Sequence, residues 1–339
     1  MAPADGRVGV VDIAGPLCRR VTFQSVPRAP REPAFGLARE TVATVLVVEL
    51  GVTFSHVEVG NDPAAIREVA QALEANGVGY LVANDHVVGG HPDRQRPGEK
   101  LHTYDVACHE PFTLLGFVAG ATSNLGLVTS VIIAPQRQTV LLAKQAAELD
   151  LLCGGRLRLG VGIGRNWMEY EALNETFTNR GRRLEEQVDV LRRLWRDELV
   201  TFDGQWHHLD RVGLNPLPVQ RPIPIWMGSF VGQLVEKVLE RTGRLADGWM
   251  PQFPPGDELR DAIDRLRSYA ERAGRDPATV GIEAVMRLRP TDNAKDWVAT
   301  AEAYRALGAT HLRAATAGTA LDPDGYLELV TRWHGEVGA

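Results

Sequence analysis

Short apolar segments alternate with longer amphipathic segments along most of the chain, beginning near residue 48. The short segments are rich in Val, Ile and Leu, as buried β-strands are, and the longer ones repeat their apolar positions every three or four residues, as surface helices do. The predicted strands cover 49–54, 79–83, 126–132, 157–162, 223–228, 245–249, 280–285 and 309–313. The predicted helices cover 63–76, 110–123, 137–151, 180–196, 231–242, 257–273, 295–307 and 323–335.

Eight strand–helix pairs in alternation predict a parallel sheet, and their number favours an α/β TIM (β/α)8 barrel. A doubly wound open sheet uses the same units and stays open as an alternative. The longest departure from the repeat is an insertion over 165–222, between the fourth and fifth strands. There we expect a helix and a hairpin around Val200–Trp206, turned at Asp203-Gly204.

The composition changes near residue 48. The first 47 residues carry six arginines and four acidic residues, a net charge of +2, whereas the whole chain of 339 residues carries −6 and the rest therefore −8. We predict an N-terminal extension over 1–47, either disordered or preceding the true start, and one barrel domain over 48–339.

The overall composition excludes several classes of protein. An apolar fraction of 44% is typical of a water-soluble globular chain, and no apolar run approaches the ~18 residues of a membrane span. The negative net charge argues against nucleic acid as a partner. Three cysteines without CxxC spacing fit a reducing compartment. We therefore expect a cytoplasmic protein with a small-molecule ligand and no membrane partner, and we leave a homodimer as one assembly to test.

An acid and an imidazole stand side by side where the second predicted strand ends. Asp85 and His86 follow that strand directly, and in barrels of this kind the chemistry lies at the C-terminal ends of the strands. A histidine exchanges protons near neutral pH, and a neighbouring carboxylate can orient its ring or bind a cofactor edge. The alternative is an ordinary turn in which the aspartate caps the backbone.

Glycines mark two further strand ends. Gly160, Gly162 and Gly164 recur with a period of two, so one face of the fourth strand lacks side chains. A flat ring or a sugar-phosphate chain could approach such a face, and close packing of the protein itself is the alternative. Gly228 and Ser229 stand between the fifth strand and a predicted helix, where backbone amides could hold a phosphate.

Several ordered motifs carry a family resemblance. They are Glu110-Pro111-Phe112, Ala134-Pro135-Gln136-Arg137-Gln138, Ala143-Lys144-Gln145-Ala146-Ala147-Glu148-Leu149-Asp150, Gly154-Gly155-Arg156 with the glycine strand that follows, Arg180-Gly181-Arg182-Arg183, and Pro222-Ile223-Pro224-Ile225-Trp226. Over about 49–250 the sequence resembles the luciferase-like flavin and deazaflavin oxidoreductases, and within them it is most similar to the branch that depends on coenzyme F420.

The resemblance implies a TIM barrel that binds the deazaflavin in its C-terminal mouth. It places Asp85 near the pyrimidine side of the ring and His86 near the hydride-accepting carbon. It also implies three further features of the cofactor site. They are a bulge with a non-proline cis peptide behind the ring, a border of glycines along the ring, and a turn that holds a phosphate. The residues concerned are Thr129, Ser130 and Val131 for the bulge, Gly160, Gly162 and Gly164 for the border, and Gly228 and Ser229 for the turn.

One position departs from the family pattern. Where the sugar-phosphate dehydrogenases of the family carry a glutamate after the fourth-strand glycines, this chain has Arg165. The departure argues against a glucose-6-phosphate-type substrate. Arg165 could bind the anionic tail of the cofactor or an anionic substrate, and a solvent-facing arginine is the alternative.

The resulting hypothesis is hydride transfer between a deazaflavin and an organic substrate, with His86 as proton donor or acceptor. One alternative is an FMN-dependent luciferase-like monooxygenase. A metal-dependent barrel hydrolase is a more distant one, because it would want an HxH pair after the first strand and His56 stands alone there. We predict no metal site.

Overall fold

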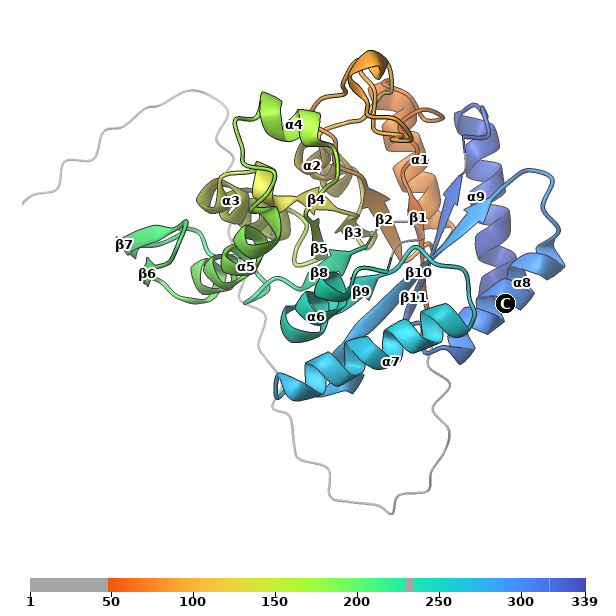
Figure 1. Ribbon diagram of the computed structural model, residues 1–339. Helices are drawn as coiled ribbons and strands as arrows, with labels where there is room; N and C mark the ends of the chain where they lie inside the picture. Colours follow the sequence, from red (N-terminus) through yellow and green to blue (C-terminus); the bar gives the residue numbers. More distant parts are fainter. Residues whose placement is uncertain (1–47, 230–233, 317) are drawn as a thin grey trace, which may run out of the picture. The chain divides into compact units, whose positions relative to one another are not determined.

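Nine strands close into a parallel barrel surrounded by helices in the computed structural model, which describes residues 48–229, 234–316 and 318–339 (Figure 1). The strands of the barrel are β1 (Glu49–Thr53), β2 (Tyr80–Ala83), β3 (Gly126–Thr129), β4 (Ile132–Ile133), β5 (Leu157–Gly162), β8 (Ile225–Gly228), β9 (Gly248–Met250), β10 (Gly281–Leu288) and β11 (His311–Thr316). β11 pairs with β1, and β5 pairs with both β3 and β4, so the sheet has no free edge. This confirms the predicted TIM barrel against the open sheet.

β3 and β4 are two halves of one barrel strand. The chain advances five residues from Leu127 to Ile132 while the paired β5 advances four, from Leu157 to Val161. The extra residue makes a bulge at 130–131, and the peptide bond between Ser130 and Val131 is cis. The single strand predicted over 126–132 is therefore interrupted, at the place where the family resemblance implies the cis peptide.

In the part of the chain that the structure describes, eight helices follow the barrel strands and pack around them (Figure 1). They are α1 (Pro63–Ala75), α2 (Pro111–Ala121), α3 (Thr139–Leu152), α5 (Arg180–Arg196), α6 (Glu236–Leu245), α7 (Asp257–Arg272), α8 (Ala294–Ala306) and α9 (Pro323–Gly338). In α1 the Asp62 side chain accepts from Ala64 N at 2.9 Å and Pro63 occupies the first turn, because the N–H groups of a first turn have no intrahelical acceptor and a proline there loses none.

The predicted insertion contains α4 (Trp167–Ala172), α5 and a hairpin of β6 (Val200–Asp203) and β7 (His208–Val212). The hairpin confirms the predicted turn, since Gly204 N donates to His207 O. The sequence analysis missed α4. The helix after β8 was predicted to begin at residue 231, whereas α6 begins at Glu236 with Val235 as its N-cap. Residues 1–47, the predicted extension, lie outside the described residues.

Large side chains fill the N-terminal half of the barrel. A Cβ on Gly248 would lie 2.3 Å from the Trp226 ring, so the glycine makes room for the indole. The Arg158 guanidinium lies 4.5 Å from the ring centres of both Tyr80 and Trp226, and it pairs with the fully buried Glu283. The packed lower half leaves the C-terminal ends of the strands as the place for a ligand. Within the described residues, no helix is both long and apolar enough to span a bilayer.

Candidate active site

A cavity of about 270 Å³ lies at the C-terminal ends of the strands. Residues after β2, from the bulge, and after β5, β8 and β9 line it. Nine of the eleven predicted site residues are among them: Asp85, His86, Ser130, Val131, Gly162, Gly164, Arg165, Gly228 and Ser229. Two do not line the cavity. Thr129 and Gly160 lie below its floor, where the buried Thr129 Oγ1 donates to Gly160 O at 2.8 Å.

The glycines of β5 and β8 make room for the bulge rather than presenting a bare face to a ligand. A Cβ on Gly162 would lie 2.5 Å from Val131 Cγ2, and one on Gly228 would lie 2.7 Å from Val131 Cγ1. A Cβ on Gly160 would lie 1.9 Å from Thr129 O. The prediction that a ring needs these glycines is therefore wrong for Gly160. For Gly162 and Gly228 the protein's own valine is the group that approaches the backbone, and it forms the cavity floor.

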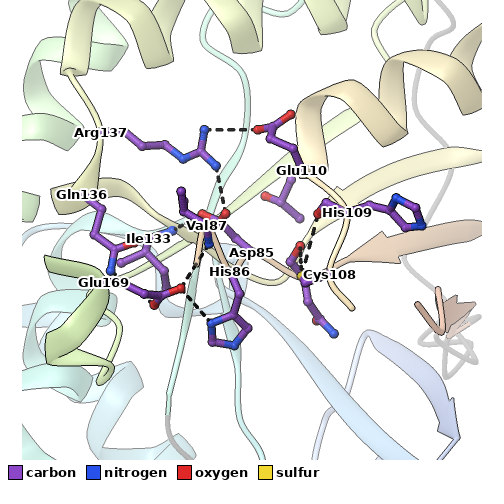
Figure 2. Close-up of polar contacts among 12 residues, drawn as sticks. Asp85, His86, Val87, Cys108, His109, Glu110, Ile133, Gln136, Arg137 and Glu169 are labelled. Carbon is purple, nitrogen blue, oxygen red and sulfur yellow. Dashed lines mark hydrogen bonds and ion pairs between the residues drawn. The ribbon is translucent and has the colours of Figure 1, made fainter. Parts of the chain in front are cut away.

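Asp85 ties the end of β2 to the bulge (Figure 2). Its Oδ1 accepts from Arg137 Nη2 at 2.8 Å and its Oδ2 accepts from Ile133 N at 2.9 Å. The side chain is 1% exposed. Although Asp85 belongs to the cavity wall, both carboxylate oxygens already have protein partners, so the structure gives it a supporting role that the sequence analysis did not assign.

His86 is held by a buried carboxylate from the insertion (Figure 2). Glu169 Oε1 lies 3.1 Å from His86 Nδ1 and accepts from Val87 N at 3.1 Å, while Oε2 accepts from Gln136 Nε2 at 3.5 Å. Glu169 is 1% exposed, whereas 37% of the His86 side chain is exposed. An ionised carboxylate only accepts, so Nδ1 carries the proton and Nε2 is left with a lone pair. No residue in the described part of the chain bonds Nε2.

The sequence analysis missed Glu169, which lies on α4. A signal for it exists in the sequence: Asn166 is followed by a short helical segment directly after the glycine strand, and its side chain accepts from Met168 N as the N-cap. This chain has Arg165 where those dehydrogenases carry a glutamate, but it has a glutamate four residues later, Glu169, which bonds His86.

Two groups could meet an anionic ligand at the mouth. Arg165 is exposed and donates to Lys100 O at 2.5 Å. Ser229 Oγ is buried and has no partner among the described residues. The expected helix after Ser229 falls in part on residues 230–233, which lie outside the described residues, and α6 starts at Glu236. The Ser229 amide already has a protein partner, because Ser229 N donates to Met250 O at 3.3 Å.

These observations fit a deazaflavin or flavin. The bulge gives a floor of backbone and one aliphatic side chain against which a flat ring can lie, and the orphaned Ser229 hydroxyl and Arg165 supply donors for an anionic tail. Among the residues that the structure describes, no group of three or more His, Cys, Asp or Glu side chains could hold a metal ion.

A closed barrel with a bulge-floored cavity and a carboxylate-held histidine at its C-terminal mouth defines a barrel enzyme of the cofactor-binding kind. The chain belongs to the luciferase-like monooxygenase family, whose model matches residues 44–335. This confirms the resemblance drawn from the sequence motifs.

Named relatives support the predicted branch. The chain is 31% identical over 241 residues to an F420-dependent hydroxymycolic acid dehydrogenase of Mycobacterium tuberculosis, a match that covers 69% of this chain and 61% of the relative. It is 30% identical over 236 residues to an F420-dependent glucose-6-phosphate dehydrogenase of Gordonia bronchialis, covering 67% and 63%. The fold is similar to that of a solved F420-dependent secondary alcohol dehydrogenase in complex with an F420-acetone adduct, with a TM-score of 0.70 at 18% identity over 86% of this chain and 99% of that one.

Proposed function

We propose that the protein is a coenzyme F420-dependent oxidoreductase that transfers a hydride between the deazaflavin and an organic substrate. The observation that carries the proposal is His86, which Glu169 fixes through Nδ1 at the edge of a cavity floored by the Ser130–Val131 bulge. The two named relatives, both F420-dependent dehydrogenases, support the choice of cofactor.

Different residues of the cavity would hold different parts of the cofactor. Val131 and the Ser130–Val131 backbone would back the ring, and Gly162 and Gly164 would border it. Ser229 Oγ and Arg165 would bind the anionic tail. When bound, the deazaflavin supplies a two-electron site that accepts or gives up a hydride.

His86 moves the proton. When an alcohol is oxidised, its carbon loses a hydride, its hydroxyl loses a proton, and a carbonyl forms. His86 Nε2 accepts that proton because Nδ1 is already protonated and bonded to Glu169. The carboxylate then stabilises the imidazolium by a charge-assisted hydrogen bond. In the direction of reduction, the same nitrogen returns the proton to the oxygen.

The purified protein tests the proposal directly. We expect it to bind F420, measured by quenching of the cofactor's fluorescence, and not to retain FMN. A screen of F420 oxidation and reduction against alcohols, enones and imines should then find turnover, which His86→Ala abolishes without weakening F420 binding. A yellow, FMN-loaded preparation that consumes oxygen would instead show the FMN-dependent monooxygenase.

The remaining expectations on the molecule's setting also belong to this proposal. We propose a cytoplasmic enzyme, supported by the free thiols of Cys108 and Cys153, and a barrel domain over 48–339. We also propose a homodimer, supported by the exposed Val140, Leu141 and Leu152 of α3. Cell fractionation and sedimentation velocity test the first and the last.

A further inference from the structure

A second cavity, of about 240 Å³, adjoins the first. The two share Asn84 and His86, so the histidine forms part of the wall between them. The second cavity is lined mainly by the ends of β1 and β2 and by the loop before α2, with Phe54, His56, Val57, His102, Val106 and Cys108 among its lining residues. Neither His56 nor Cys108 has a part in the function proposed above, and this inference rests on that function.

The second cavity carries no fixed charge. None of the described residues that line it is Lys, Arg, Asp or Glu. Burial lowers the pKa of His56 to about 4, and burial is also the largest cause that lowers the pKa of His102. Burial raises the pKa of the Cys108 thiol to about 11. At neutral pH these three groups are therefore uncharged, and a phosphate or carboxylate would lose its hydration there without gaining a counter-charge.

His56 presents a fixed donor to this cavity. Its Nδ1 accepts from His109 N at 3.1 Å, so the proton of the neutral ring is on Nε2. Among the described residues, the polar partner of Nε2 is the Cys108 sulfur, at 3.9 Å. A thiol sulfur is a weak acceptor, so an oxygen atom of a ligand would be a better partner. His56 is 7% exposed, which fixes the direction of the ring.

The side chains at the outer edge of the second cavity are apolar. Val57 and Val106 both line it, yet they are 65% and 45% exposed. Two large exposed aliphatic side chains at the edge of one cavity favour a ligand whose body is apolar and reaches outward between them. The volume suits a ligand of on the order of ten non-hydrogen atoms, if each takes up somewhat less than the ~30 Å³ of a water molecule.

From these contacts we infer that the second cavity is the substrate site and that its substrate is a neutral alcohol or carbonyl compound with an apolar body. The substrate oxygen accepts from His56 Nε2 and lies within reach of His86. His56 is therefore a specificity residue, and phosphorylated or carboxylated compounds are excluded. In the oxidation, the hydrogen on the carbinol carbon leaves with the electron pair of its bond as hydride to the deazaflavin, and the hydroxyl proton leaves to His86. One hydride, which carries two electrons, and one separate proton are thereby accounted for.

The first test needs no cofactor. Cys108 lines the cavity, and Cys153, which caps α3 at the opposite end of the barrel, serves as the internal control. Modification of each thiol by N-ethylmaleimide is followed by peptide mass spectrometry with cyclohexanone or glucose 6-phosphate present. We expect cyclohexanone to slow the labelling of Cys108 at least threefold and glucose 6-phosphate to leave it unchanged. Equal labelling in all samples, no labelling at all, or protection by the phosphate overturns the inference.

The second test uses the F420-loaded enzyme and neutral secondary alcohols of increasing length. His56→Leu should lower kcat/KM about tenfold, the worth of one hydrogen bond, and His56→Gln, which keeps a donor near the Nε2 position, should restore part of it. Val57→Asp should raise KM for these alcohols. The matched control is Val219→Asp, which is also exposed but lies near Gly155, before the start of β5.

The outcomes separate this inference from the proposed function. Failure of F420 to bind would refute the proposed function, whereas Cys108 protection would still report on the cavity. F420 binding with turnover of charged substrates alone, or unchanged kcat/KM in both His56 variants, would refute the neutral substrate site and leave the proposed function standing.

Discussion

Acidification from pH 7 to pH 5 should destabilise the protein through His56 alone by about 2 kcal/mol. The buried His56 has a pKa of about 4 in the folded chain, and burial is the largest cause, followed by the neighbouring His109. In the unfolded chain its pKa returns to about 6.5. Between these two values the unfolded state binds the proton and the folded state does not, so stability is lost as the pH falls.

The magnitude follows from the two pKa values. At pH 5 the unfolded histidine is almost fully protonated and the folded one is mostly neutral, which favours unfolding by about 2 kcal/mol. Because the side chain is only 7% exposed, solvent does little to reduce this figure. For a domain of about 290 residues the melting temperature should fall by roughly 3 °C from this residue.

The assay compares the wild-type protein with His56→Gln in urea at pH 7 and pH 5. Other groups, His102 and His334 included, titrate in both proteins, so their contributions cancel in the difference. We expect the wild-type free energy of unfolding to fall by about 2 kcal/mol more than that of the variant. If both proteins lose the same stability, His56 is not buried as a neutral ring and the reasoning fails.

Three further substitutions test the site and the barrel. Glu169→Gln removes the charge that stabilises protonated His86 and should lower kcat at least tenfold with F420 affinity unchanged. Glu171→Gln, at an exposed position on the same helix, should leave kcat unchanged, and equal effects of the two variants would count against the pairing of Glu169 with His86. Gly162→Ala places a Cβ 2.5 Å from the floor valine and should weaken F420 binding about tenfold. The matched control Gly116→Ala, with nothing within 4 Å, should retain affinity and stabilise its helix by about 1 kcal/mol. Glu283→Gln leaves the buried Arg313 and the partly buried Arg158 without a full counter-charge and should cost about 3 kcal/mol in urea unfolding, and a cost below ~1 kcal/mol would contradict this.

The barrel could be predicted from sequence because its signal is local and repeated. About a dozen residues are enough to predict each strand or amphipathic helix from its apolar pattern. Because the pattern repeats eight times, an error at one element boundary does not change the predicted fold. The bulge is different. The run from Leu127 to Ile133 is apolar apart from Thr129 and Ser130, two hydroxyl residues that a strand tolerates, so the pattern alone predicts one strand. Only the family motifs pointed to the cis peptide.

The function of the glycines could not be derived from their spacing. A period of two shows that one face is bare, but it does not show what occupies the space. Here the space is occupied by the Thr129 carbonyl oxygen at Gly160, by Val131 at Gly162 and by Ile133 at Gly164, all about thirty positions earlier in the chain. The same limit applies to Asp85, whose partner Arg137 is 52 positions away, and to His86, whose partner Glu169 is 83 positions away. No local pattern encodes such pairs.

The pairing of charges explains how an acidic chain can hold an anionic cofactor. Asp85 is matched by the charge of Arg137, whereas Glu169 accepts hydrogen bonds from His86 Nδ1 and Val87 N. Arg165 is different, because it forms no ion pair with any carboxylate of the described residues and bonds only a backbone carbonyl at the mouth. The net charge of the chain is therefore a poor guide to the field in the cavity. We propose that Arg165, at the rim of the cavity, favours the binding of an anionic tail there.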